Sequence, residues 1–234
     1  MREVIWAAML RAGALLVALA LPLQAQETPM PGAIGRISYG ANGPKAGAAI
    51  CTGSLVAADL VLTARHCLEV ALAAPETVRF EADLVGTRSR AVRQGAEVIL
   101  PSAAVTGDRA NDVALLRLAR LIPRDAVVPL KLSDPAERTS AKGYAVFAYR
   151  RDASDKPGGR VDCRRMADFP GVLALSCPVV SGNSGAPVLL WDGKGWRIAA
   201  VMVASVGSAG GAVRSLAALI PPDISARITA SSAR

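Results

Sequence analysis

Short apolar runs separated by Gly, Pro, Asp or Asn dominate the chain after residue 32. These runs are rich in Val, Ile and Leu and have the length of β-strands, whereas helical periodicity is scarce. The expected strands are Ala33–Tyr39, Ala48–Val56, Leu60–Ala64, Thr77–Ala82, Ala91–Leu100, Val113–Leu118, Gly143–Tyr149, Val172–Cys177, Ala186–Trp191 and Trp196–Ser205. Many short strands at regular spacing predict an all-β barrel or sandwich.

A proline-bearing stretch, Leu121–Thr139, separates two strand-dense regions of the chain. We therefore expect a first β unit over residues 34–125, a linker over 126–139 and a second β unit over 140–234. A short turn of helix is expected within Cys67–Ala74. A C-terminal helix is expected to begin at Pro222, because Pro suits the first helical position and Asp223 suits the first turn.

The first 25 residues have the pattern of a secretory signal peptide. Arg2 and Arg11 supply positive charge, residues 12–23 carry no charge, and the small Ala25 precedes a polar segment. The alternative is an uncleaved membrane anchor, but a span of about 20 apolar residues would place Arg11 in its middle. We therefore expect cleavage after Ala25, a lead-in segment over residues 26–33, and export to the periplasm or the extracellular medium without a stable membrane anchor.

The charge of the chain does not indicate a nucleic-acid partner. Lys and Arg outnumber Asp and Glu by 27 to 19, which gives a formal net charge of +8. The basic residues are scattered along the sequence, whereas affinity for phosphates needs a focused basic stripe. With 52% hydrophobic residues, the chain has the composition of a globular protein with a packed core.

Four cysteines become candidates for disulfides if the protein is exported. Four cysteines allow three pairings, and the spacings favour Cys51–Cys67 and Cys163–Cys177, two short loops in different halves of the chain. A metal site is the competing interpretation. It is disfavoured because the sequence has no CxxC motif and its single histidine, His66, lies directly beside Cys67, a poor spacing for tetrahedral ligands. We expect neither a metal nor an organic cofactor.

Three segments carry the residue types of an activated serine: Leu62–Cys67, Asn111–Leu118 and Ser181–Pro187. A Ser hydroxyl is a weak nucleophile until an adjacent base takes its proton. An imidazole suits that role, and a carboxylate can fix the tautomer of the imidazole. Each segment alone is a weak signal, because a lone His, an Asp before a strand and a Gly-x-Ser-Gly turn are all common. Their combination on an exported, β-rich chain is far more specific, and it selects His66, Asp112 and Ser184.

On these residues the chain resembles the trypsin/chymotrypsin-like serine peptidases, in particular their bacterial secreted branch. The resemblance runs from about Ile34 to near the C-terminus and rests on Cys51–Val56, Val61–Cys67, Asp112–Leu116 and Gly182–Pro187. It implies two antiparallel six-stranded β-barrels, a short C-terminal helix and a site between the barrels. It also implies that Ser184 attacks the scissile carbonyl, that His66 carries the proton and that Asp112 orients the imidazole. The N–H groups of Gly182 and Ser184 would form the oxyanion hole, and Cys51–Cys67 would be the bridge behind the histidine.

Two residues depart from the pattern of this family. Asn183 stands where the animal digestive enzymes have an Asp that pairs with the amino group freed by zymogen cleavage. A neutral amide forms no such ion pair, so we expect a site that forms without a propeptide cut. Arg65 stands where the family has a small residue. Its stem can pack against the Cys51–Cys67 bridge while its guanidinium reaches water. We expect a tolerated variation at this position, and the alternative is a charge that perturbs the His66–Asp112 pair and weakens catalysis.

The sequence constrains the substrate pocket only in part. By approximate alignment with the family, Pro178 lies near the pocket base, and Val203, Ala204 and Ser205 form the strand that pairs with the substrate. One expected wall, Val172–Ser181, contains no Asp or Glu, which disfavours Lys or Arg substrates. Selection of Glu through a second histidine is excluded, because none exists, whereas selection of Glu through Arg or the N-terminal amine stays open. We expect an apolar or small side chain in the pocket.

These features predict a secreted, monomeric serine endopeptidase that acts on protein or peptide substrates. The alternative from another class is a catalytically silent binding domain that keeps the fold, which would show neither hydrolysis nor covalent labelling. An esterase of the α/β-hydrolase fold is disfavoured, because those enzymes place Ser before His and alternate strands with helices. Here His66 precedes Ser184.

Overall fold

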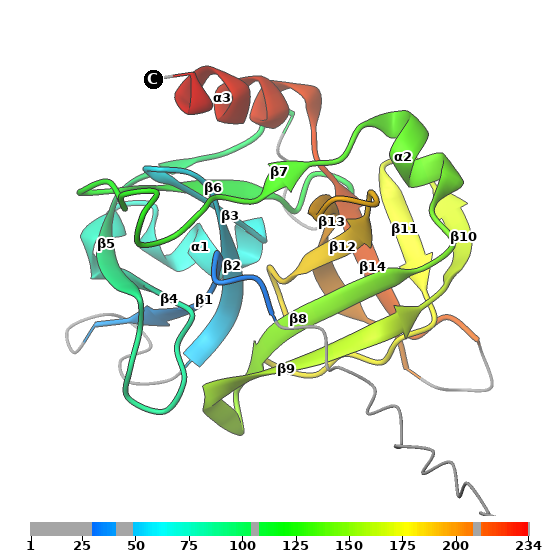
Figure 1. The fold of residues 1–234 in the computed structure, drawn as a ribbon, viewed down its shortest axis with the longest axis horizontal. Helices are drawn as coiled ribbons and strands as arrows, with labels where there is room; N and C mark the ends of the chain where they lie inside the picture. The colour runs from blue at the N-terminus through cyan, green and yellow to red at the C-terminus, as the bar shows by residue number, and fades with distance from the viewer. Residues whose placement is uncertain (1–29, 41–48, 104–107, 208–211, 234) are drawn as a thin grey trace, which may run out of the picture.

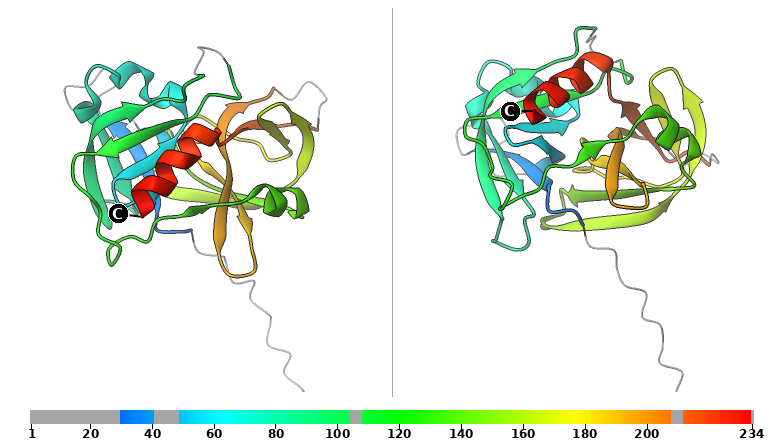
Figure 2. Two further views of the ribbon diagram at one scale, coloured as in Figure 1. Left: turned by 90° about the horizontal axis from the view of Figure 1, so that it is seen from above. Right: turned by 45° about the horizontal axis from the view of Figure 1, so that its top comes forward.

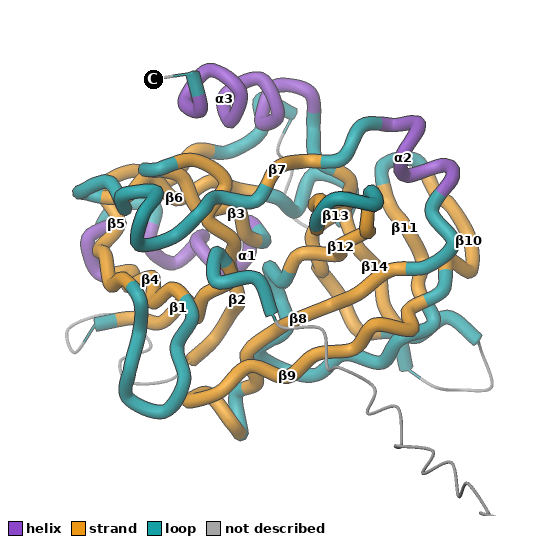
Figure 3. Tube along the Cα trace, viewed as in Figure 1, coloured by secondary structure: helices purple, strands orange, loops and turns teal. Residues whose placement is uncertain are grey.

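The computed structural model describes residues 30–40, 49–103, 108–207 and 212–233, and most of the ordered elements are strands (Figure 3). The strands form two units that lie side by side, one between residues 34 and 118 and the other between residues 131 and 219 (Figure 1). The expected signal peptide lies outside the described residues. Among the helices of the described ranges, none is long and apolar enough to cross a membrane.

The first unit is a closed barrel of six antiparallel strands in the order β1-β2-β3-β6-β5-β4. The strands are β1 (Ile34–Tyr39), β2 (Ala49–Ala57), β3 (Leu60–Thr63), β4 (Val78–Ala82), β5 (Ala91–Ile99) and β6 (Ala114–Leu118). Every bound lies within one residue of the predicted one. Ile37, Leu55, Phe80 and Leu116 are excluded from solvent in the core, and burial of such side chains stabilises the barrel.

The second unit differs from the expected six-stranded barrel, because it is an eight-stranded sheet in the order β10-β11-β14-β13-β12-β8-β9, with β7 paired parallel to β13. The strands are β7 (Lys131–Leu132), β8 (Tyr144–Arg150), β9 (Ala153–Cys163), β10 (Arg165–Phe169), β11 (Val172–Leu175), β12 (Pro187–Trp191), β13 (Trp196–Ser205) and β14 (Ser215–Leu219). The two outermost strands, β9 and β10, are consecutive in the chain and separated only by Arg164. The sheet therefore curls until its two edges meet at one corner (Figure 1).

Several elements of the second unit could not be predicted from runs of apolar residues in the sequence. Strand β9 contains Asp, Lys, Pro and Gly and pairs only with β8, so it needs few buried side chains. Helix α2 (Pro135–Ser140) lies within the predicted linker and begins with a capping box. In this box the Asp134 carboxylate accepts a hydrogen bond from Glu137 N at 2.7 Å, and the Glu137 carboxylate accepts one from Asp134 N at 2.8 Å. The linker is therefore partly ordered by local side-chain chemistry.

The C-terminal helix α3 (Pro222–Ser232) is present as predicted. It follows the second unit in sequence, yet it contacts β2 and lies across the outside of the first barrel (Figure 2). Ile224 and Ile228 are buried in the same core as the barrel strands, and Ser231 Oγ donates a hydrogen bond to Asp59 Oδ1 at 2.6 Å. The helix thus ties the end of the chain to the unit that contains His66 and Asp112.

Candidate active site

Two disulfides have the pairing favoured by the sequence. Cys51 in β2 is bonded to Cys67 in the short helix α1 (Arg65–Leu68), and Cys163 at the end of β9 is bonded to Cys177. Cys51, His66 and Cys67 also form the one cluster of possible metal ligands among the described residues. Because the two sulfurs are bonded to each other, they offer no thiolate, and a single imidazole remains at this position.

Helix α1 positions His66 at the end of β3. Tyr39 Oη donates a hydrogen bond to Cys67 O at 2.5 Å, and burial raises the pKa of Tyr39 to about 12. The phenol therefore stays protonated at neutral pH and keeps this part of the chain in place. The His66 side chain is 38% exposed, so its ring is accessible from solvent. The backbone of the next residue, Cys67, is fixed by the hydrogen bond from Tyr39.

Asp112 precedes β6 and contacts His66 through both carboxylate oxygens. Asp112 Oδ2 lies 2.7 Å from Nδ1 of the His66 ring, and Oδ1 accepts a hydrogen bond from the His66 backbone N at 3.0 Å. The carboxylate is 15% exposed, so it interacts with the ring in a less hydrated environment than a surface carboxylate. The contact favours the tautomer with hydrogen on Nδ1 and leaves Nε2 available as a proton acceptor.

Ser184 lies on a turn between two glycines with left-handed backbone conformations, Gly182 at φ +102° and Gly185 at φ +80°. Thr52 of β2 fixes the turn from the first barrel: Thr52 N donates to Ser184 O at 2.8 Å, and Thr52 Oγ1 donates to Gly182 O at 2.9 Å. A Cβ on Gly185 would lie 3.0 Å from Ala64 N, two residues before His66. The turn is therefore packed against Ala64, the residue that connects β3 to the helix containing His66.

Two N–H groups of this turn have no acceptor among the residues that the structure describes. Asn183 N donates to Val180 O at 3.0 Å and Gly185 N donates to Met202 O at 2.8 Å, whereas the N–H groups of Gly182 and Ser184 donate to no other described group. Ser184 Oγ also makes no hydrogen bond within the described chain. Donors that are held in place and unused can stabilise an oxygen that becomes negative during a reaction.

A family model, the trypsin-like peptidase domain, matches residues 51–200. The chain belongs to the trypsin-like peptidase family. A solved structure described as "Structure of Glu endopeptidase in complex with MPD" matches with a TM-score of 0.68 over 87% of this chain and 91% of that chain. The sequence identity is 17%, so this likeness shows a shared fold. The predicted all-β, trypsin-like fold and the predicted class, a serine-type hydrolase, are confirmed.

In this trypsin-like peptidase, a pocket of about 390 Å³ opens beside Ser184. Its lining consists of Val179, Val180, Ser181, Ser184, Met202, Val203, Ala204 and Ser205, and none of these side chains is charged. The structure thus brings the predicted substrate strand to Ser184. Pro178 is not among the residues that line this pocket, although its neighbours Val179 and Val180 are, so its place near the pocket base stays a prediction.

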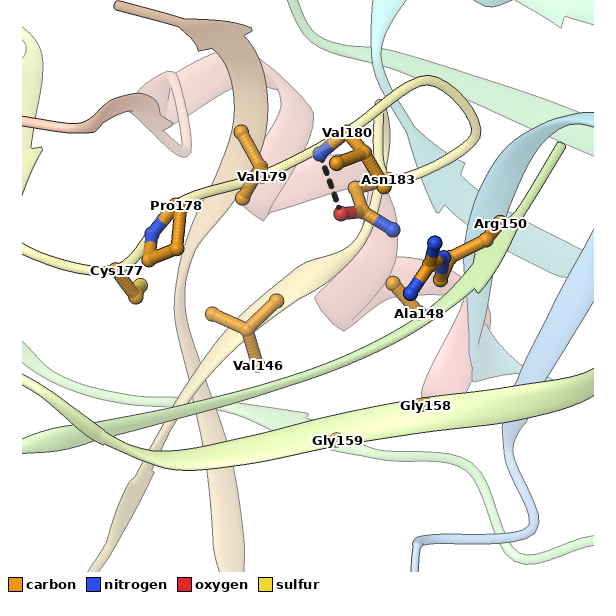
Figure 4. A pocket seen from close by; sticks show the side chains of 10 residues that line it. All are labelled: Val146, Ala148, Arg150, Gly158, Gly159, Cys177, Pro178, Val179, Val180 and Asn183. Carbon is orange, nitrogen blue, oxygen red and sulfur yellow. Dashed lines mark hydrogen bonds between the residues drawn. The ribbon is translucent and has the colours of Figure 1, made fainter. Parts of the chain in front are cut away.

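Pro178 lines a second pocket, behind the segment that leads to Ser184 (Figure 4). This rear pocket lies between that segment and strands β8 and β9, with Val146 facing the Pro178 ring and Arg150 near Asn183 (Figure 4). The Asn183 amide is bonded to the backbone: Oδ1 accepts from Val180 N at 2.9 Å, and Nδ2 donates to Tyr149 O at 3.1 Å. Val179 and Val180 line both this pocket and the pocket beside Ser184, so the segment separates the two pockets.

Arg65 also differs from expectation. Its guanidinium was expected to reach water, but the side chain is only 7% exposed. One nitrogen, Nη2, pairs with Glu69 Oε1 at 3.1 Å, while the buried Nε has no hydrogen-bond partner. Arg65 lies on the same pocket as His66 and Asp112. The helical start at Arg65 turns its side chain into this pocket and brings Glu69, four residues on, within reach.

Thr52 is the residue that the sequence analysis missed. Besides its two bonds to the Ser184 turn, its Oγ1 accepts a hydrogen bond from Tyr149 N at 2.9 Å. Thr52 therefore connects the first barrel, β8 and the Ser184 turn. Its position directly after Cys51, within a family motif, was the available signal, but a Thr in a strand gives no indication of a partner about 130 residues away.

Proposed function

We propose that the chain is an exported serine endopeptidase that uses Ser184, His66 and Asp112 through an acyl-enzyme. The observation that carries this proposal is the coincidence of an oriented imidazole and a serine turn with two unused N–H donors. Ser184 Oγ makes no hydrogen bond to another described residue, and catalytic hydrogen bonds commonly tighten only when substrate binds. The two pockets that contain His66 and Ser184 share Val203 as a common wall, so a substrate can contact both residues.

In the proposed reaction, Ser184 Oγ attacks the scissile carbonyl carbon while its proton passes to His66 Nε2. The carbonyl oxygen becomes negative and accepts hydrogen bonds from the N–H groups of Gly182 and Ser184. The C–N bond then breaks, and the leaving amine takes the proton from His66. Water repeats the sequence on the acyl-serine and releases the second product. Asp112 stays ionised and stabilises the imidazolium.

Activity without a propeptide cut is part of the proposal. A new N-terminal ammonium would need a buried carboxylate behind the oxyanion turn, but Asn183 is neutral and both ends of its amide are bonded to the backbone. The described residues that line the rear pocket include no Asp or Glu, and the one cation among them, Arg150, is already paired with Asp152 at 2.7 Å. The turn is supported instead by Thr52, Tyr149 and Val180.

Export and cleavage after Ala25 also form part of the proposal. They rest on the charged, apolar and small-residue order of the first 25 residues. The two disulfides support them, because such bonds persist in oxidising compartments outside the cytosol.

The uncharged pocket beside Ser184 favours a small, neutral substrate side chain such as Ala or Val. The structurally similar protein is described as a Glu endopeptidase, but no cation lines this pocket to pair with a Glu carboxylate. Burying an unpaired charge is costly, so we expect kcat/KM to be at least about tenfold higher for Ala or Val than for Glu or Arg.

Hydrolysis of peptides that differ only at the residue contributing the attacked carbonyl tests this function. Ser184→Ala serves as the inactive control. Cleavage after Ala or Val by the wild-type protein alone is the expected result. A preference for Glu or Arg would contradict the assignment of the pocket. No cleavage of any peptide by the folded protein would favour the silent binding domain.

A further inference from the structure

The pocket on the His66 side has a different chemistry from the pocket at Ser184. It has a volume of about 310 Å³ and is lined by side chains of both charges, including Arg65, Arg109, Glu69 and Asp108. Some of these groups have hydrogen-bond or ion-pair partners within the protein, and others have none among the described residues. A ligand that displaces water from this pocket is expected to supply whatever kind of group is missing, because polar groups that lose their water need new hydrogen-bond partners.

All three carboxylates of this pocket have partners. Asp112 is bonded to His66, and Glu69 is paired with Arg65. Asp108 Oδ2 accepts from Asn111 Nδ2 at 2.7 Å, and its Oδ1 accepts from Ala110 N at 2.9 Å. These hydrogen bonds hold the pKa of Asp108 below its usual value, the bond from Asn111 contributing most. The acceptors of the pocket are thus already engaged.

The guanidinium groups of the pocket, in contrast, are not fully paired within the described chain. Arg109 is exposed and forms no ion pair or hydrogen bond within the described chain. Arg65, more than nine-tenths buried, has an Nε with no acceptor. Because the Arg65 Nε is shielded from solvent, the unmatched group that a ligand can reach is the Arg109 guanidinium, a donor with positive charge. A carboxylate fits it best, because a guanidinium binds a carboxylate through paired, charge-assisted hydrogen bonds.

The location of the pocket indicates which substrate residue could carry that carboxylate. Val203 of β13 lines both pockets. Successive side chains of an extended peptide point in opposite directions. If one side chain of a peptide lying along β13 enters the pocket at Ser184, its neighbour on the N-terminal side points toward the pocket of Arg109 and His66.

We propose that this second pocket selects substrates with Asp or Glu immediately before the residue that enters the Ser184 pocket, and that Arg109 is the main selecting residue. This inference rests on the proposed function and adds to it a substrate class: peptides with an acidic residue followed by a small neutral residue at the cleaved bond. The acidic side chain is bound beside the catalytic histidine and not in the pocket of the attacked residue.

Matched peptides test the inference. Two peptides with Ala at the cleaved bond carry Glu or Gln at the preceding position. Each is assayed with the wild-type protein, Arg109→Gln and the control Arg120→Gln, whose side chain is exposed and lines none of these pockets. We expect kcat/KM for the Glu peptide to exceed that for the Gln peptide by about fivefold in the wild type and in Arg120→Gln. In Arg109→Gln the ratio should fall to about one, and high salt should reduce the wild-type ratio.

A binding measurement separates failure of this inference from failure of the proposed function. Calorimetry of the same two peptides with Ser184→Ala requires no hydrolysis, and tighter binding of the Glu peptide is the expected result. If neither peptide is cleaved but the Glu peptide still binds more tightly, the proposed function fails and the inference on the pocket stands. Equal binding of the two peptides, or a preference for Glu that persists in Arg109→Gln, would overturn the inference. So would a preference for acid only on the C-terminal side of the cleaved bond.

Discussion

Asp112→Asn is expected to lower kcat/KM by roughly four orders of magnitude. In the native protein Asp112 accepts from the His66 backbone and lies 2.7 Å from Nδ1 of the ring. An amide in its place can present its NH2 group to Nδ1, which would put the hydrogen on Nε2 and remove the base that Ser184 needs. The substitution also removes the negative charge that stabilises the imidazolium.

The matched control is Asp125→Asn, in the exposed connector between the two units. It removes the same charge from the protein without touching His66, and we expect its kcat/KM to equal that of the wild type. Both variants are measured on the best Ala peptide at pH 7–8, with circular dichroism to check the fold. An Asp112→Asn protein that keeps more than about a tenth of wild-type activity would show that Asp112 does not orient the base.

Gly185→Ala is expected to destabilise the protein by roughly 2–6 kcal/mol and to abolish activity. The backbone at Gly185 has φ +80°, a conformation that costs a residue with a Cβ about 1–3 kcal/mol. The new methyl would also overlap Thr63 Oγ1 and Thr52 O and lie 3.0 Å from Ala64 N, and overpacking adds about 1–3 kcal/mol. The Ser184 turn would have to move away from the first barrel.

Gly193→Ala provides the comparison for this effect. Gly193 has a similar backbone angle, φ +91°, but a Cβ there meets no atom within 4 Å. Its substitution is expected to cost only the conformational term, about 1–3 kcal/mol. Thermal unfolding should therefore show a fall in Tm of roughly 10 °C for Gly185→Ala and a few degrees for Gly193→Ala. Equal shifts would mean that the contact between the Ser184 turn and β3 contributes nothing.

The first barrel was predictable because its strands are short apolar runs with Gly and Pro between them. The C-terminal helix was predictable from Pro222 and Asp223. Strand β9 was not, because an edge strand pairs through its backbone and its polar side chains remain in solvent. Helix α2 could have been read from the capping box at Asp134 and Glu137, a local signal that does not depend on apolar periodicity.

The proposed catalytic residues, His66, Asp112 and Ser184, could be predicted from motifs, whereas their surroundings could not. Long side chains such as Arg65 take their partners from the tertiary structure, so a sequence gives no indication that Arg65 is buried or that Arg109 is unpaired. The pocket that Pro178 lines could not be predicted for a related reason. Its neighbours Val179 and Val180 line both pockets, and an approximate alignment does not resolve which side chains of such an irregular segment line which pocket.

Covalent labelling with a fluorophosphonate probe tests the proposed mechanism most directly. The protein beginning at Gln26 is purified with both disulfides intact, labelled and analysed by mass spectrometry beside Ser184→Ala and His66→Ala. We expect one adduct, on Ser184, that is absent from both variants, on a chain whose N-terminus remains uncut. No adduct on the folded wild-type protein would contradict an activated Ser184. An adduct that forms only after the N-terminus is trimmed would contradict activity without a propeptide cut.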